Sequence, residues 1–343
     1  MPITEKSEFF YSLLRCPVTG NELRFQRLSA VDGLLWATDQ LVYPVIDGIP
    51  RLLPEAMIDY AEFLTLHIPD LAIRFQAIPA SIADTITYCE RKNRRTKESF
   101  AFEWSHFQYG QDKTWDADES FMFQRFLRET DETAGSLNGK IVLDVGCGNG
   151  VLDRLIGEAG ALVVAMDMSR SIEQASRSIS SESVFFIQGD LQYPPIKSAS
   201  MDLVQCSGVL IHTNSTRRSF FTIEKTVKKD GKLSVWVYHQ RKDAIHRFFN
   251  VLRNYTSKLP LRVQYYLYLL TLLPVSFLIK RIKGNKQNVR EMMVDILDWF
   301  TPEYRWEHSH EEVADWFRKA GYEHIQKTTV EVFGFNTTGV KKG

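Results

Sequence analysis

The sequence holds few features that would place the protein outside the cell interior or across a membrane. It has four cysteines, which are too few and too scattered for a disulfide framework, so a reducing compartment is favoured. Residues 1–16 contain acidic side chains and no long apolar core, so we expect no secretory signal. Because no uninterrupted run of about 18 apolar residues occurs, the sequence predicts no membrane span. We therefore expect a cytoplasmic protein.

The chain also lacks a net charge, internal repeats and low-complexity segments. Lys and Arg together number 42, as do Asp and Glu, so the overall charge selects no partner. The length of 343 residues indicates one large domain with additions, or two domains, and a hydrophobic content of 44% is enough for a sizeable core.

A glycine-rich loop stands between a strand-like apolar run and a helix-like run. The stretch is LDVGCGNG, residues 143–150. This context is what a nucleotide-binding loop requires, but the dinucleotide fingerprint would need one more residue before its third glycine. Asp144 lies two residues before the first glycine, where a carboxylate would repel a pyrophosphate and attract an ammonium group. The loop therefore favours S-adenosylmethionine (SAM), which has a cationic end and no phosphate, over NAD.

Polar and small residues follow the later strands of the same region. Asp167 ends the run ALVVAMD about 20 residues beyond the loop, where a carboxylate can accept hydrogen bonds from both ribose hydroxyls. In GDL, Asp190 can accept from the adenine amine and Leu191 can pack on the adenine ring; for Asp190 alone, a turn or helix-cap role is the less favoured alternative. The run MDLVQCS, which ends in Ser207, is followed by GVLIHT, in the position that would border the methyl-donor end.

Residues 140–240 alternate strand-like and helix-like segments, which predicts βαβ units and a parallel sheet covered on both faces. With its motifs LDVGCGNG, VAMDMS, QGDL, CSGVLIHT and KKDGKLSVWVY, the region from about 100 to 340 resembles a class I SAM-dependent methyltransferase. The resemblance implies an α/β, Rossmann-like sheet of seven strands that ends in an antiparallel hairpin, which residues 322–340 could supply. It also implies that SAM is the cofactor.

The motifs and the resemblance together assign the cofactor site. The candidate SAM-binding residues are Asp144, Gly146, Cys147, Gly148, Gly150, Asp167, Met168, Asp190, Leu191 and Ser207. Cys147 is expected to contribute its backbone and not its thiol. One departure is KKDGKL, where the family often has Pro-Gly-Gly, but Asp230-Gly231 still makes a turn. A lone glycine-rich turn is often only a tight turn, and the later motifs disfavour that alternative.

Residues 9–55 are predicted to be a small β-rich unit. Its stretches LLRCPVTGNELRF and LVYPVIDGIPRLLPE resemble the zinc-ribbon-like domain of the tRNA-methyltransferase-activator type, which also occurs fused ahead of bacterial methyltransferases. Members that bind zinc carry two Cys-x-x-Cys pairs, whereas here Thr19 stands at the second cysteine position after Cys16, and residues 37–40 hold no Cys or His. We therefore predict that the unit binds no metal and that Cys16 is a buried relic.

These patterns divide the chain into three parts. They are residues 1–58, a β-rich ribbon-like domain; residues 59–135, a helical linker and lid; and residues 136–343, the SAM-binding methyltransferase domain with a basic helical insert at 241–300. In the second part, the aromatic segment ESFAFEW forms either a lid over the cofactor or the packed core of a helix. Its aromatic residues are Phe100, Phe102 and Trp104.

Methyl transfer from a sulfonium is an in-line displacement that needs alignment and can use a general base. Three candidate catalytic residues follow the fourth and fifth strands of the predicted sheet: His212 in GVLIHT, and Tyr238 and His239 in VWVYHQ. A surface or capping role is the competing interpretation for each histidine, including His308 and His310 further along the chain. Ser309 is expected to cap a short amphipathic helix at 311–320.

Residues 241–290 hold eleven Lys or Arg and one acid, Asp243. Between the basic residues lies VQYYLYLLTLLPVSFLI, which has 17 residues, no charge and an interruption at Pro274, so it is poorly suited to span a membrane. Two further alternatives stay open. The block is either a helical cap that buries its apolar stripe over the substrate pocket, or a surface that docks on anionic lipid or a phosphate-bearing substrate.

The sequence therefore predicts a SAM-dependent methyltransferase that acts on a small-molecule acceptor, which could be anionic or lipid-linked. The resemblance to fused enzymes suggests a secondary-metabolite or glycan pathway, and residues 241–290 suggest peripheral membrane contact. The alternative is a tRNA or rRNA methyltransferase that holds RNA with the ribbon domain and the basic insert. Nucleic acid is the less favoured partner because the basic residues flank an apolar block. A non-enzymatic scaffold is disfavoured by the intact donor motifs.

Overall fold

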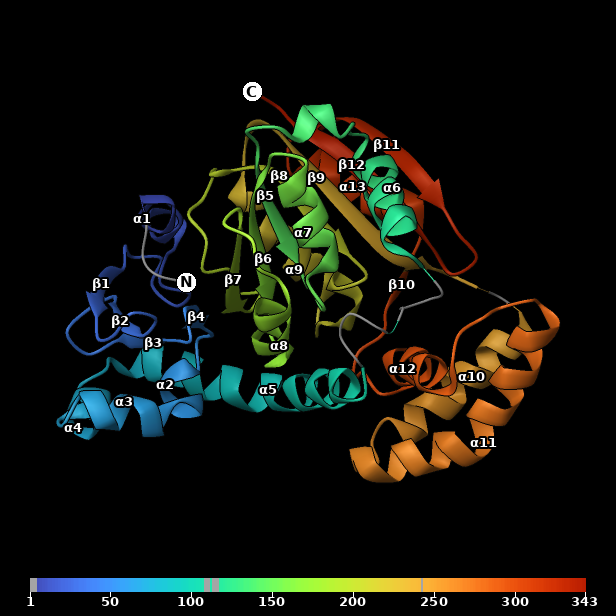
Figure 1. The fold of residues 1–343 in the computed structure, drawn as a ribbon, viewed down its shortest axis with the longest axis horizontal. Coiled ribbons are helices and arrows are strands. Elements are labelled where there is room, and N and C mark those ends of the chain that lie inside the picture. The colour runs from blue at the N-terminus through green and yellow to red at the C-terminus, as the bar shows by residue number, and fades with distance from the viewer. Residues whose placement is uncertain (1–4, 108–111, 113–116, 242) are drawn as a thin grey trace.

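The structure, a computed structural model, describes residues 5–107, 112, 117–241 and 243–343. Its centre is a sheet in which seven strands follow the order β7-β6-β5-β8-β9-β12-β11 (Figure 1). The strands are β5 (Ile141–Val145), β6 (Leu162–Asp167), β7 (Val184–Gly189), β8 (Met201–Ser207), β9 (Val227–His239), β11 (Tyr322–Val330) and β12 (Gly334–Lys341). The first five are parallel, and β12 runs antiparallel between β9 and β11. This order confirms the predicted Rossmann-like sheet with its terminal hairpin.

Helices cover both faces of this sheet, which explains why its central strands are almost continuously apolar. Along β6, Val163 packs into a core on one face while Val164 packs into the core on the other. The first face is covered by α6 (Glu119–Thr130), α7 (Val151–Glu158) and α8 (Ser171–Ser178), and the second by α9 (Thr216–Ile223) and α13 (His310–Lys319). Ser309 caps α13 through Glu312 N, as predicted. Single 3-10 turns lie at Gly135–Leu137, Leu210–His212 and Glu224–Thr226.

The N-terminal β-rich region is joined to the central sheet. It comprises α1 (Glu5–Leu13), β1 (Arg24–Arg27), β2 (Gly33–Trp36), β3 (Val42–Ile46) and β4 (Ile49–Leu52). β4 pairs in parallel with β7, so the seven-stranded order continues into β4, β3, β2 and β1. Leu35 and Leu52 belong to the same hydrophobic core as Val164. The N-terminal region is therefore a β-rich extension of the sheet, and its division from the rest as a domain over residues 1–58 stays a prediction.

A long helix connects this extension to the far side of the molecule. After α2 (Ala56–Asp59), α3 (Ala61–His67) and α4 (Leu71–Gln76), helix α5 (Ala80–Ser105) runs below the sheet toward α12, as Figure 1 shows. Ser99 Oγ donates to Thr301 Oγ1 at 2.9 Å, which ties α5 to the residue that follows α12. Helices α3, α4, α5 and α6 make up most of the described residues between 59 and 135, and α5, with 26 residues, is the longest of them.

The basic insert is a three-helix unit. It consists of α10 (Ala244–Thr256), α11 (Leu261–Ile282) and α12 (Val289–Phe300), followed by β10 (Glu307–His308), which pairs in parallel with β9. α12 begins with a capping box between Asn288 and Glu291. Leu273 and Met292 belong to a core that is separate from those of the sheet. In Figure 1, α10 and α11 lie on the outer side of α12, away from the sheet.

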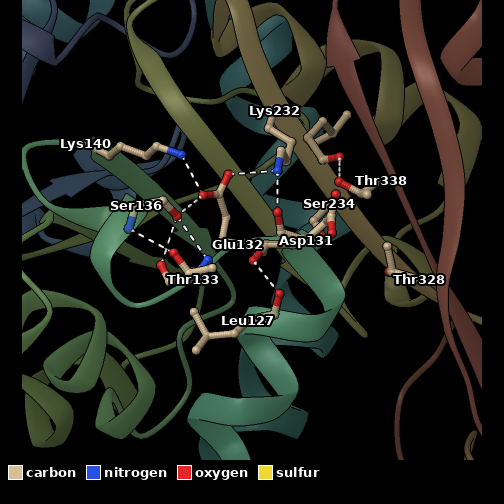
Figure 2. Close-up of polar contacts among 12 residues, drawn as sticks. Leu127, Asp131, Glu132, Thr133, Ser136, Lys140, Lys232, Ser234, Thr328 and Thr338 are labelled. Carbon is tan, nitrogen blue, oxygen red and sulfur yellow. Dashed lines mark hydrogen bonds and ion pairs between the residues drawn. The ribbon is translucent and has the colours of Figure 1, made fainter.

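Polar contacts fix the end of α6 against the sheet (Figure 2). The carboxylate of Glu132 forms ion pairs with Lys140 at 2.7 Å and Lys232 at 2.8 Å, and it accepts a hydrogen bond from Ser136. Burial alone would raise the pKa of Glu132, but the hydrogen bonds from these three side chains outweigh it and leave the pKa lowered. The segment leading into β5 and the strand β9 are thus connected through one carboxylate.

Candidate functional site

One large cavity lies at the carboxyl ends of the parallel strands. Its volume is about 1130 Å³. Residues from the loops after β5, β6, β7 and β8 line one side, and residues from α5, α10, α11 and α12 line the others. The strand order reverses between β5 and β8, so the cavity occupies the position at which open α/β sheets bind their ligands. We call the part at the β5 loop the donor end and the part toward α12 the acceptor end.

The glycine loop after β5 forms the floor of the donor end with its backbone. Gly146 and Gly148 both have left-handed φ angles, of 80° and 55°. A Cβ at Gly146 would lie 2.3 Å from Val209 Cγ2, and one at Gly148 would lie 2.9 Å from Trp104 Cζ2. Any side chain at these positions would therefore strain the backbone and crowd the cavity.

Cys147 and Gly150 are the other two loop residues predicted to bind the cofactor. Cys147 lines the cavity but is buried, and its burial raises the pKa of the thiol well above its usual value, so the thiol is neutral. Gly150 is absent from the cavity wall; it precedes α7 with a φ of 75°, and a Cβ there would lie 2.9 Å from Ile179 Cδ1. Gly150 thus allows close packing of α7 on its neighbours, and its contribution to cofactor binding stays a prediction.

The first acid of the donor end is one of a buried pair. Asp144 lines the cavity, and Asp153 lies behind it on α7, fully buried. Burial raises the pKa of Asp144 to about 7, with the charges of Asp167 and Glu129 adding to the effect and a hydrogen bond from Asp153 opposing it. Burial and the charge of Asp144 raise the pKa of Asp153 well above its usual value. Burial therefore favours the protonated form of both carboxyl groups, and Asp153 is not among the residues predicted from the sequence.

The second acid, Asp167, is held by its own turn. Its Oδ1 accepts hydrogen bonds from Ser169 N at 2.8 Å and Ser169 Oγ at 2.9 Å, and its Oδ2 accepts a longer one from Gly148 N at 3.3 Å. Burial raises its pKa, and the Ser169 bonds oppose that rise. Met168 follows on the cavity wall. Asp167 is thus oriented toward the loop, with one oxygen weakly engaged.

The third acid, Asp190, already has partners. It is fully buried, its Oδ2 accepts from Lys92 Nζ at 2.8 Å and Asn93 Nδ2 at 3.1 Å, and its Oδ1 accepts from Gln192 N at 2.8 Å. Lys92 and Asn93 lie on α5, nearly one hundred residues earlier, and nothing in the local sequence signals the pairing. Leu191 and Ser207 line the cavity as expected. The contact between Asp190 and adenine stays a prediction.

The aromatic segment of α5 contacts both the cavity and the insert. Phe100 and Trp104 line the cavity, and Trp104 lies over the glycine loop. Phe102 faces the insert, where its ring lies edge-on to Tyr265 at a centroid distance of 6.0 Å. Phe100 and Trp104 therefore lie on the cavity side of α5, and Phe102 lies on the side that packs against the insert; a lid over the cofactor stays a prediction.

At the acceptor end, His212 lines the cavity. Its Nδ1 lies 2.9 Å from the carbonyl oxygen of Tyr304, which can only accept, so Nδ1 carries the proton and Nε2 carries the lone pair. Burial lowers the pKa of His212 to about 3, with a hydrogen bond to Tyr304 opposing the shift and the charges of Arg253 and Arg305 adding to it. The ring is therefore neutral and held in one tautomer. Tyr238 lies on the same wall, and burial raises the pKa of its hydroxyl.

His239 is absent from the cavity wall, and its catalytic role stays a prediction. Neighbouring residues of a strand point to opposite faces, so the position next to Tyr238 faces away. Its Nε2 hydrogen-bonds the carbonyl of Val332 at 2.8 Å. His308 and His310 are also absent from the wall, and His308 pairs with Glu312 at 3.0 Å. Of the four histidines considered from sequence, only His212 faces the cavity.

Three acids that the sequence analysis missed stand at the acceptor end: Glu103 on α5, and Asp295 and Asp298 on α12. Burial and the charges of Asp298, Asp295 and Asp167 raise the pKa of Glu103 well above its usual value, and its Oε2 has no hydrogen-bond partner among the described residues. Burial, with the charge of Asp295, raises the pKa of Asp298 to about 7. Asp295 pairs with Lys280 at 2.7 Å. The cluster joins segments almost 200 residues apart, so no local motif could reveal it.

The described residues contain no group of three or more His, Cys, Asp or Glu suited to a metal ion. Cys16 is buried, and its sulfur lies 3.3 Å from the Tyr43 hydroxyl and 3.4 Å from Thr19 N. All four cysteines are free thiols. The interactions of Cys16 are thus those of a packed core residue.

Comparison with known proteins identifies the class of the central region. Residues 143–235 match the family model described as a methyltransferase domain. This part of the chain is therefore a class I SAM-dependent methyltransferase domain, and SAM is the cofactor of that class. The match contains every predicted cofactor residue, and it ends before Tyr238 and the basic insert.

Among curated proteins, the chain is similar to ubiquinone biosynthesis O-methyltransferases. It is 32% identical over 114 residues to the mitochondrial protein of Schizosaccharomyces pombe, and the aligned region covers 32% of this chain and 41% of that protein. It is 30% identical over 101 residues to the protein of Coxiella burnetii, and the aligned region covers 29% of this chain and 43% of that protein. The chain thus spans less than half the length of these relatives. The resemblance of the N-terminal region to the ribbon-like domain stays a prediction.

A solved structure similar in outline is magnesium protoporphyrin IX methyltransferase from Synechocystis. It shares 15% identity with a TM-score of 0.44, over 73% of this chain and all of that one. A likeness at this level adds nothing to the strand order described above.

Proposed function

We propose that the protein transfers a methyl group from SAM to a hydroxyl group of a small, largely apolar or lipid-linked acceptor. The observation that carries this proposal is the single cavity, which joins the glycine loop and Asp167 at one end to His212 and the acid cluster at the other. The similar curated proteins are named as O-methyltransferases, which favours oxygen as the accepting atom. A secondary-metabolite or glycan pathway stays a prediction.

The donor end fits SAM by the chemistry of its groups. The backbone at Gly146 and Gly148 leaves space that a Cβ would fill, Asp144 provides a carboxyl group for an ammonium, and Asp167 provides acceptors for ribose hydroxyls. When SAM is bound, it supplies an electrophilic methyl group. Trp104, lying over the loop, excludes water from this end.

The acceptor end fits a neutral group that must lose a proton. His212 Nε2 can accept the proton that a hydroxyl loses as its oxygen takes the methyl group, and the hydrogen bond to Tyr304 holds that nitrogen in place. Trp299, Phe300 and Ile279 supply apolar wall around the acceptor. An anionic portion would have to avoid the acid cluster and face Arg241 or Lys283, which also line the cavity.

The test is methyl transfer from isotopically labelled SAM in two extracts, one of lipids and one of water-soluble metabolites. We expect label in a product that resists mild alkaline hydrolysis, as an ether does, and calorimetric binding of SAM to the protein alone. Absence of SAM binding would overturn the proposal at the donor end. Label only in a base-labile ester or in an amine would overturn the hydroxyl acceptor.

No observation favours the RNA alternative, because Glu103, Asp295 and Asp298 would repel a phosphate backbone entering the acceptor end. A gel shift at low salt with transfer RNA checks this point, and we expect none. We also propose that the enzyme works in the cytoplasm, where SAM and reduced thiols are both present.

A further inference from the structure

Helix α11 exposes an apolar face that no part of the described chain covers. Its outer face consists of Val263, Tyr266, Leu270, Phe277 and Leu278, which recur at helical spacing and are all solvent-exposed. Leu270, near the middle, is 76% exposed. The helix has a mean hydropathy of 1.3 over its most apolar window, and only 17% of that window is buried. Such a surface on a folded protein marks an interaction site.

The charges around this outer face are of one sign. The sequence contains no Asp or Glu between Asp243 and Glu291. Exposed cations flank the apolar face at both ends: Arg247, Lys258 and Arg262 before it, and Lys283 and Lys286 after it. Apolar residues bordered by Lys and Arg complement an anionic phospholipid surface, which offers acyl chains beneath phosphate groups.

The opposite face of α11 is held by the protein, which argues against a helix that crosses the bilayer. Buried Gln264 donates to the carbonyl of Leu259 at 2.7 Å, and the Tyr268 hydroxyl donates to Thr256 Oγ1 at 2.8 Å. Lys280 pairs with Asp295 of α12 at 2.7 Å. A spanning helix would have to break all three contacts and leave polar groups in hydrocarbon. The helix is therefore suited to lie on a membrane.

The same helix forms part of the cavity wall. Val275, Ser276 and Ile279 line the acceptor end, while Leu270 and Leu278 belong to the outer face. We propose that the outer face of α11 docks the protein on an anionic phospholipid bilayer and so places the acceptor end of the cavity beside the lipid. The docking is independent of the proposed reaction; only the access of a lipid-linked acceptor to the cavity depends on it.

The experiment is flotation of the full chain with vesicles of phosphatidylglycerol and phosphatidylcholine in equal parts, compared with pure phosphatidylcholine. We expect binding to the mixed vesicles that weakens with salt. The variant Leu270→Glu/Leu278→Glu should lose binding by at least about tenfold, because each change removes apolar contact and adds like charge. The matched control is Leu66→Glu/Ile73→Glu on α3 and α4, at positions 77% and 70% exposed, which should bind as the parent does.

A second pair of variants tests the flanking charges. Lys258→Glu/Arg262→Glu should weaken binding by about fivefold or more for each cation. Lys197→Glu/Lys225→Glu, on an exposed surface outside the insert, is the control for net charge. Calorimetry with SAM must give the parent affinity for every variant, since none of these residues lines the cavity. This keeps a failure of docking distinct from a failure of the methyltransferase proposal.

Three outcomes would overturn the docking proposal. The first is no flotation with mixed vesicles, or equal losses in the α11 variant and its Leu66/Ile73 control. The second is a dimer in size-exclusion chromatography that Leu270→Glu/Leu278→Glu dissociates without any vesicle binding, because a second copy would then cover the face. The third is retention of the protein in membranes after extraction at alkaline pH, which would indicate a spanning helix.

Discussion

The two ends of the cavity are built in different ways. The donor end comes from one short stretch, LDVGCGNG, whose backbone conformation does most of the shaping, with Asp144 and Asp167 at the ends of adjacent strands. The acceptor end is assembled from side chains of α5, β9, α12 and the turn at His212. A loop fixed by local geometry tolerates few substitutions, whereas a wall of distant side chains can change its specificity by single replacements. We therefore expect changes at the donor end to affect SAM binding and changes at the acceptor end to affect turnover.

The largest effect is expected at the acceptor end. Changing His212→Ala should lower the transfer rate by about a hundredfold or more, because a positioned base is lost, while SAM affinity stays at the parent value. Labelled transfer and calorimetry measure the two quantities separately. His239→Ala is the matched control and should transfer normally. Equal losses of transfer rate in both variants, or a loss of SAM binding in His212→Ala, would show that the two ends of the cavity do not act separately on turnover and on SAM binding.

The next effect is at the donor end. Changing Gly148→Val places a side chain at a left-handed φ against Trp104, which combines about 1–2 kcal/mol of backbone strain with about 1–3 kcal/mol of overpacking. SAM affinity should therefore fall on the order of a hundredfold in calorimetry. Gly139→Val is the control, because Gly139 has a φ of 77° but open space where its Cβ would lie. Gly139→Val should lower thermal stability and leave SAM affinity unchanged. If Gly139→Val lost as much SAM affinity as Gly148→Val, backbone strain alone would explain the loss in both variants.

A pH dependence of SAM affinity is expected at the donor end. Because burial raises the pKa of Asp144 to about 7, the carboxyl is protonated in the free protein below that pH, and an ammonium must displace the proton. SAM affinity should therefore fall by up to about tenfold for each unit of pH below 7, with proton release on binding. Calorimetry in two buffers of different ionisation enthalpy measures both.

The Asp144 prediction has its own control in its buried neighbour. The groups facing Asp144 are Asp153 from α7, Asp167 from β6 and Glu129 from α6. Asp153→Asn keeps a hydrogen-bond donor beside Asp144, so the pH at which affinity falls should stay at the parent value, whereas Asp153→Leu removes the donor and should move the fall to higher pH. An affinity for SAM that is constant from pH 5 to pH 8 would show that Asp144 does not meet a cation.

The smallest effect is expected outside both ends. Glu132 is almost fully buried between Lys140 and Lys232, and its pKa is lowered in the folded state (Figure 2). Its contribution is therefore present above its unfolded pKa and is lost as pH falls through the lower folded pKa. Glu132→Gln should cost about 1 kcal/mol of unfolding free energy at neutral pH and nothing in strong acid. Urea denaturation at two pH values measures this, and SAM affinity should not change.

The control for Glu132 is an exposed ion pair. Glu22 pairs with Arg15 at 3.0 Å, but its side chain is almost fully exposed, so Glu22→Gln should leave stability unchanged. If the two variants lose the same stability, the cost reflects charge alone and not the burial of the Glu132 network.

The donor end could be predicted from sequence because its signals are local. Glycine spacing, an acid before the loop and an acid after the next strand all lie within about 25 residues, and a parallel strand order brings them together. The same locality limits the prediction for Gly150, since spacing cannot tell a glycine that admits a ligand from one that admits a helix. Strand alternation separates Tyr238, which lines the cavity, from its neighbour His239, which does not.

The acceptor end could not be predicted because its members meet only in the folded chain. Lys92 reaches Asp190, and Glu103 meets Asp298, through the course of α5 beneath the sheet. Nothing in the sequence of α5 marks these residues apart from others on an amphipathic helix. The insert was predicted to be helical because its apolar periodicity is local, but which of its faces met the protein depended on the packing of α12.

The parallel pairing of β4 with β7 has a consequence for the sheet as a whole. In the seven-stranded order, β7 would be an edge strand with unpaired N–H and C=O groups, and Arg51 and Leu52 of β4 occupy that edge beside Gln188 and Gly189. An uncovered edge is a template for pairing between molecules. The β-rich extension therefore acts as protection against self-association, and a chain that lacked it would be exposed to aggregation even with its catalytic residues intact.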